Sequence, residues 1–115
     1  MERYDLFDLH ADFCKTLSNP KRLRIIALLA RKERSVGEIA EAIGVSLSNA
    51  SQHLAVLKAQ NLVNTRKEGQ TVYCGLADRR IIQACTMIRS VLLDNMKNRG
   101  LVAQEADPRY AITEA

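Results

Sequence analysis

The feature that most constrains this chain is a glycine turn between two short amphipathic segments, at residues 35–60. In the first segment, Ser35 and Glu38 have the spacing of a capping box, which closes the N-terminus of a helix. Apolar residues then recur at helical spacing until Gly44, the residue type that most often ends a helix. A second apolar repeat begins three residues later and runs over Leu47–Gln60. Two short helices joined by so tight a turn predict a helix-turn-helix.

The second helix of this pair is followed by a predicted β-hairpin. Within the helix, apolar residues at 3-4-3 spacing are expected to face the core: Leu47, Ala50, Leu54 and Leu57. Two alternating segments, Leu62–Lys67 and Thr71–Leu76, then flank the turn residues 68–70. Alternation around a glycine-containing turn is typical of a hairpin, which at this place would form the wing.

Three further helices are predicted around this unit. The first, Asp5–Leu17, carries a broad apolar arc, and the second, Pro20 to about Lys32, has Asn19 as its N-cap. The last, Asp78 to about Arg99, is apolar on more than one face. In a chain of 115 residues such a helix needs a second surface to cover it, so we interpret it as a dimer element, with the first helix as its companion.

The predicted architecture is therefore mainly α with a small β-hairpin, a winged helix-turn-helix that dimerises through its first and last helices. One DNA-binding and dimerisation domain is expected over residues 1–100, followed by a flexible C-terminal tail over residues 101–115. The charge agrees with a nucleic-acid partner: residues 15–67 hold ten bases and three acids, a net charge of +7.

Several function classes are disfavoured by the same residues. No apolar run approaches the ~18–20 residues of a membrane span, and the first residues are acidic where a signal peptide would be basic, so we expect a cytoplasmic protein without a membrane partner. The three cysteines are too few and too widely spaced for a disulfide framework and are expected as thiols. There is no glycine-rich phosphate loop and no nucleophile signature, so neither an enzyme nor a bound cofactor is expected.

The order of elements and three stretches of sequence resemble the arsenic-repressor (ArsR/SmtB) family. Residues 17–29 are similar to the family's opening pattern L-x-x-P-x-R-L-x-I-L-x-L-L, residues 46–57 to its recognition helix, and residues 62–76 to its wing. The resemblance covers roughly residues 10–98. It implies a homodimeric repressor that binds double-stranded operator DNA and releases it when an effector binds.

The recognition helix predicts which side chains read the DNA. In a helix-turn-helix the N-terminal residues of this helix lie nearest the bases, and Asn and Gln can each form two hydrogen bonds to adenine. No Arg or Lys lies at that end, so phosphate contacts are expected from the helix end and the wing. His53 could touch a phosphate or be half buried beside Leu54 and Leu57. The full predicted DNA-binding set is Ser46, Ser48, Asn49, Ser51, Gln52, His53, Lys58, Arg66, Lys67, Gln70 and Thr71.

The family's known metal sites do not carry over to this chain. Where arsenic- and cadmium-binding members have Cys-Val-Cys, residues 35–37 read Ser-Val-Gly. The zinc members have Asp and His at the start of the last helix, followed by a His pair. Here Asp78 is followed by Arg80, and Val91 and Asp94 stand at the later positions. No metal site is therefore assigned.

The inducing signal is left open between several readings. If the first and last helices pack together, Cys14 and Cys85 could approach and respond to an oxidant or a reactive sulfur species. A soft metal could instead use both thiols and His10, or the cysteines could be ordinary packing residues, as Cys74 is expected to be. The known sulfur-responsive members carry a second-helix cysteine where this chain has Ala27. Two readings without sensing also remain: a constitutive repressor, and a winged-helix module that binds protein.

Overall fold

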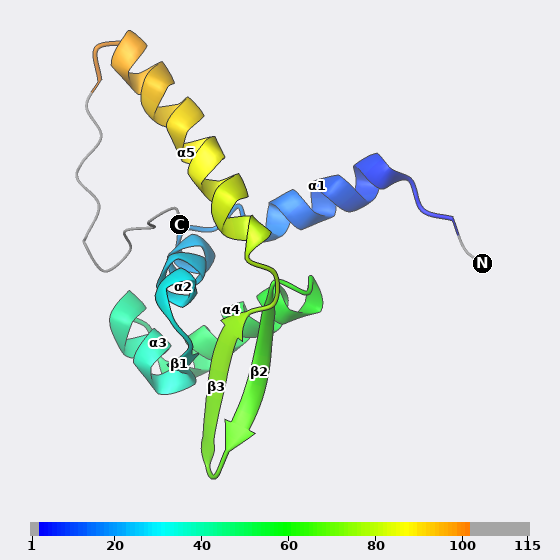
Figure 1. Ribbon diagram of the computed structural model, residues 1–115, viewed down its shortest axis with the longest axis vertical. Coiled ribbons are helices and arrows are strands. Elements are labelled where there is room, and N and C mark those ends of the chain that lie inside the picture. The colour runs from blue at the N-terminus through cyan, green and yellow to red at the C-terminus, as the bar shows by residue number, and fades with distance from the viewer. Residues whose placement is uncertain (1–2, 102–115) are drawn as a thin grey trace.

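The computed structural model describes residues 3–101 (Figure 1). Of the predicted tail, only Leu101 is among them, so this prediction lies outside the described residues and stays a prediction. The predicted elements occur in the predicted order, with boundaries within about two residues of those expected, and one short strand, β1, is present in addition. The elements are α1 Leu6–Thr16, α2 Pro20–Arg31, β1 Arg34–Ser35, α3 Val36–Ile43, α4 Leu47–Ala59, β2 Val63–Glu68, β3 Thr71–Leu76 and α5 Arg80–Asn98.

The ends of the helix-turn-helix are made by local hydrogen bonds. The Glu38 amide donates to the Ser35 hydroxyl, and the Ser35 amide donates to the Glu38 carboxylate, which completes the predicted capping box on α3. Gly44 ends α3 with a φ of 71°, a left-handed conformation that glycine adopts without steric cost. The Ser46 hydroxyl then caps α4 by accepting from the Asn49 amide at 3.0 Å. The turn between the two helices is thus specified within the turn itself.

The wing is part of a three-stranded antiparallel sheet in the order β1-β3-β2. The hairpin closes with Glu68 opposite Thr71, and Gly69 takes a φ of 61° in the turn between them. Strand β1, which pairs Arg34 with Cys74, was not expected. A strand of two residues is too short to show an alternating pattern, and its partner strand lies some forty positions later in the chain, so the sequence did not predict it.

The core lies between α2, the helix-turn-helix and the base of the sheet. Its largest fully buried side chains come from α2, α3, α4 and β3: Ile25, Ile26, Leu28, Leu29, Ile39, Leu57 and Cys74. The burial of Cys74 confirms it as a packing residue. One core prediction is wrong: Leu47 is 60% exposed, whereas Ala50, Leu54 and Leu57 on the same face are buried. Leu47 is the first residue of α4 and comes about one turn before Ala50, the first buried residue of the helix.

Helices α1 and α5 project from the end of the molecule opposite the wing (Figure 1). Only the first half of α5 reaches the core, through Ile81, Ile82 and Cys85. Most of the larger apolar side chains on the rest of the two helices are about half exposed or more: Leu6, Phe7, Leu9, Met87, Ile88, Val91, Leu92 and Leu93. Exposed apolar side chains that gather in this way along a helix are typical of a surface that a partner covers. No helix in the described part of the chain is both long and apolar enough to span a membrane.

Candidate DNA-binding surface and thiol pocket

The outward face of α4 is polar at its N-terminal half, as predicted. Ser48, Ser51 and Gln52 are exposed, and Ser46 caps the helix at its start. Val56, one turn after Gln52, adds an exposed apolar side chain to the same face. Side chains in this arrangement can offer hydrogen bonds and one methyl-bearing contact to base edges in a major groove.

Asn49 is less accessible than the sequence suggested. The residue is partly buried, and its side-chain Oδ1 atom is enclosed without a hydrogen-bond partner among the described residues. Its backbone amide is used by the Ser46 cap. A buried carbonyl oxygen without a donor is costly, and turning the Asn49 side chain outward would remove this cost.

His53 is a residue of α4, and its ring faces the start of α2. Its Nδ1 atom is 3.5 Å from Nη1 of Arg22, whose Nε donates to the Thr16 carbonyl at the end of α1. Burial, helped by the charges of Arg22 and Lys21, lowers the pKa of His53, so the neutral ring is favoured. The half-buried alternative fits this position better than a free phosphate contact.

Two basic residues at the start of α2 add positive charge beside the candidate DNA-binding surface, which the sequence pattern did not predict. Lys21 and Arg22 lie near enough to His53 of α4 to act on its titration, so two cations stand beside the recognition helix. Both residues belong to the basic segment 15–67, but the sequence does not show which surface of the protein they lie on.

The remaining predicted residues lie on the wing and at the end of α4, and they differ in whether their side chains bind other residues. Lys67, Gln70 and Thr71 are exposed at or near the tip. Lys58, at the end of α4, donates from Nζ to the Thr65 hydroxyl at 3.1 Å. Arg66 instead pairs with Glu33 and Glu68 and stacks on Tyr73. The Arg66 side chain is thus half exposed, but its guanidinium is paired within the protein.

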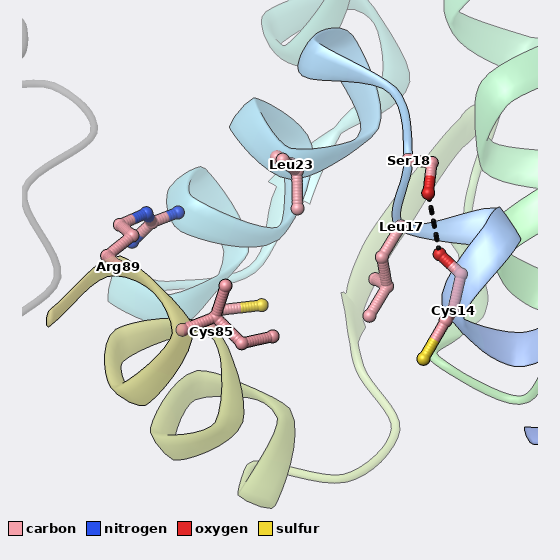
Figure 2. A pocket seen from close by; sticks show the side chains of 7 residues that line it. Cys14, Leu17, Ser18, Leu23, Cys85 and Arg89 are labelled. Carbon is pink, nitrogen blue, oxygen red and sulfur yellow. Dashed lines mark hydrogen bonds between the residues drawn. The ribbon is translucent and has the colours of Figure 1, made fainter. Parts of the chain in front are cut away.

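The two candidate sensor cysteines line one apolar pocket of about 270 Å³ between α1, α2 and α5. Cys14 is exposed and Cys85 is buried, and the Leu17 side chain lies between their sulfur atoms in Figure 2. Leu23, Ile88 and Arg89 complete the walls of the pocket. The Ser18 hydroxyl, also at the pocket, donates a hydrogen bond to the Cys14 carbonyl oxygen. Burial raises the pKa of the Cys85 thiol, opposed weakly by the charge of Arg89.

The soft-metal alternative is not supported by this arrangement. In the described part of the chain, no three His, Cys, Asp or Glu side chains come close enough together to hold a metal ion. His10 therefore does not join the two thiols as a third ligand within one chain.

Comparison with known proteins decides the family. Residues 19–65 match the family described as bacterial regulatory protein, arsR family. The nodulation protein NolR of Rhizobium meliloti is 35% identical over 108 residues, which cover 91% of this chain and 88% of NolR. The chain belongs to the ArsR family. Members of this family are DNA-binding transcriptional regulators, in agreement with the expectation that the chain is not an enzyme.

Solved structures of ArsR-type regulators have the same fold. The crystal structure of Rv0081 from M. tuberculosis superposes with a TM-score of 0.78 at 36% identity, covering 84% of this chain and 98% of Rv0081. A homodimeric winged helix-turn-helix DNA-binding domain from Mycobacterium bovis, solved by NMR, gives a TM-score of 0.70 at 33% identity, covering 87% and 91%. The winged helix-turn-helix predicted from the sequence is thereby confirmed.

Proposed function

We propose that this ArsR family member is a cytoplasmic transcriptional repressor that binds double-stranded operator DNA as a homodimer. The observation that carries the proposal is the exposed face of Ser48, Ser51 and Gln52 on α4, flanked by the exposed wing residues Lys67, Gln70 and Thr71. Side chains that form hydrogen bonds occupy the helix, and a cation lies on the wing. This is the division between base reading and phosphate binding that winged helices require.

Dimerisation is supported by the apolar faces of α1 and α5, which no other part of the described residues covers. A second copy is the occupant we propose, because the homologous domain from Mycobacterium bovis is homodimeric. A two-fold dimer would present two recognition helices to two half-sites of one operator.

Release from DNA is proposed to follow from oxidation of Cys14 and Cys85, which face one pocket. The exposed Cys14 thiol would give up its proton and its sulfur would attack hydrogen peroxide, which breaks the O–O bond and forms a sulfenic acid. The hydroxide that leaves takes up the released proton and becomes water. The Cys85 sulfur would then displace the sulfenic oxygen as a second water and form the disulfide, so two thiols lose two electrons and two protons. Since Leu17 lies between the sulfurs, α1 and α5 would have to shift, and this movement is what would change the spacing of the recognition helices.

The DNA-binding proposal is tested by fluorescence anisotropy on a duplex from the region upstream of this protein's gene. We expect Gln52→Ala to weaken binding by ~1–3 kcal/mol, about 5- to 150-fold, because a base contact is lost. Gln83→Ala, an exposed glutamine on α5, is the matched control and should bind like wild type. Equal affinity of wild type and Gln52→Ala would show that another face reads the DNA. No salt-dependent binding to any duplex would favour a protein-interaction module.

The release proposal is tested in the same assay with reduced and peroxide-treated protein. Treated wild type should lose the operator and regain it with dithiothreitol, whereas Cys14→Ser and Cys85→Ser should each remain bound. Cys74→Ser is the matched control, because Cys74 lies in the core away from this pocket, and it should respond like wild type. If wild type binds alike before and after treatment, the cysteines are packing residues and the protein is a constitutive repressor or senses another signal.

A further inference from the structure

We propose that Glu33 and Arg66 form a brace that sets the position of the wing, so that Arg66 acts on DNA binding as a positioning residue and not as a phosphate ligand. The inference rests on the proposed DNA-binding function and assigns a role that the sequence pattern alone did not suggest. It also explains why a basic wing residue is turned toward two acids.

The contacts of Arg66 join three parts of the molecule. Its Nη2 and Nε atoms lie 2.7 and 2.9 Å from the same Glu33 oxygen, and Nη1 lies 2.7 Å from Glu68. The guanidinium carbon is 4.6 Å from the ring centroid of Tyr73, the residue opposite Arg66 in the hairpin. Hydrogen bonds to the two carboxylates raise the pKa of Arg66 further, so the pairing holds at any physiological pH.

Glu33 belongs to the body of the protein and not to the wing. It stands between the end of α2 and strand β1, whose Arg34 pairs with Cys74 of β3. Its side chain also lies against Gly75, where an added Cβ would meet its carboxylate at 3.8 Å. Strand β2 is at the outer edge of the sheet, and β3 is its one partner strand among residues 3–101. The Glu33–Arg66 pair is therefore a side-chain link from the body to the edge strand.

The side chains of β2 alternate between two faces, which places the residue that positions the wing and the residue that contacts DNA on opposite faces. Successive side chains of a strand point to opposite faces, so Arg66 and Glu68 share one face and Thr65 and Lys67 share the other. Thr65 accepts from Lys58 of α4, which identifies its face as the one toward the recognition helix. Lys67 lies on that face, and within residues 3–101 no hydrogen bond or ion pair occupies its ammonium group, so the wing's cationic contact falls to Lys67.

The decisive variant is Glu33→Gln, because the two explanations predict opposite signs. If Glu33 were only an acid near DNA, removing its charge would tighten binding, since phosphate repulsion falls. If it holds the wing, binding should weaken by about 3- to 10-fold, because exposed pairs are individually modest but two wings act in one dimer. Glu41→Gln is the control: it removes an exposed acid from α3 and should leave binding equal or tighter. Glu33→Gln binding as tightly as Glu41→Gln would overturn the proposal.

The salt dependence separates a positioning residue from a phosphate ligand. Arg66→Gln should lower affinity with an unchanged slope of log Kd against log salt, whereas Lys67→Gln should reduce that slope by about one per wing. A reduced slope for Arg66→Gln would make it a phosphate ligand and refute the brace.

Amide hydrogen exchange of the free protein tests the brace without DNA, so its failure can be told apart from failure of the DNA-binding proposal. Glu33→Gln should speed exchange at residues 66–73 of the wing by about threefold or more while leaving α2 unchanged. Unchanged wing exchange would count against the brace even if no duplex were bound.

Discussion

Replacing Ile88 with glutamate tests the dimer surface most severely, because this side chain lies in the exposed apolar stripe of α5. Ile88 is 61% exposed in the single chain, and Leu92, one turn further along, is also about half exposed. If a second copy covers this stripe, each protomer buries its Ile88 against the partner, and the substitution changes the interface twice because the dimer is two-fold symmetric.

The expected loss follows from the area that dimerisation would bury. Complete burial of an isoleucine side chain contributes ~1.5–3 kcal/mol, so covering the exposed three-fifths contributes about 1–2 kcal/mol per copy. Two copies give about 2–4 kcal/mol, which raises the dimer Kd about 30- to 1000-fold. The carboxylates add a desolvation cost to this value wherever they remain out of water.

The assay is sedimentation velocity over a dilution series, followed by operator binding of the same samples. Ser90→Glu is the matched control: it adds the same charge two residues along, about 200° around the helix from Ile88. Ile88→Glu should shift to monomer and lose tight operator binding, while Ser90→Glu should behave as wild type. A wild-type dimer Kd for Ile88→Glu would refute the assignment of this face.

Three further outcomes follow from the local chemistry. Asn19→Ala should lower the free energy of unfolding by ~1 kcal/mol, measured by urea denaturation, because the Asn19 side chain accepts from the Lys21 and Arg22 amides at the start of α2. Asp78→Asn should flatten the acid end of the stability profile: Arg80 lowers the pKa of Asp78 from 3.8 to about 2, so this carboxylate's stabilisation is complete above pH 4 and is lost as the pH falls toward 2. An Asp78→Asn profile parallel to wild type over that range would contradict this assignment. Iodoacetamide at pH 8 should label Cys14 well before Cys74 and Cys85, whose pKa values are raised by burial; equal labelling rates in the folded protein would count against the described burial.

The features that the sequence predicted well are those set by neighbouring residues. The capping box of Ser35 and Glu38, the N-cap at Asn19 and the glycine at the end of α3 each need only three or four consecutive positions. The hairpin was predicted for the same reason, since alternation and Gly69 lie within one short stretch. Both partners of each of these hydrogen bonds lie within one short stretch, so the local pattern is enough to predict the bond.

The features that were missed depend on residues distant in the sequence. The pairing of Arg66 with Glu33 joins positions 33 residues apart, and the contact of His53 with Arg22 joins positions 31 apart. From the sequence alone Arg66 is predicted to bind phosphate, because the pattern does not show that Glu33 lies beside it. Leu47 was assigned to the core because periodicity gives the face of a helix but not the point at which the helix extends past its neighbours.

The measurement that tests the central claim most directly is the affinity of the reduced wild-type protein for its own upstream DNA across a salt series, against an unrelated duplex of equal length. A dimer that reads bases with α4 and phosphates with its wings should prefer the upstream duplex, and its affinity should fall steeply as salt rises. Equal binding to both duplexes would leave only a non-specific DNA-binding protein. Binding to neither, at any salt, would contradict the account.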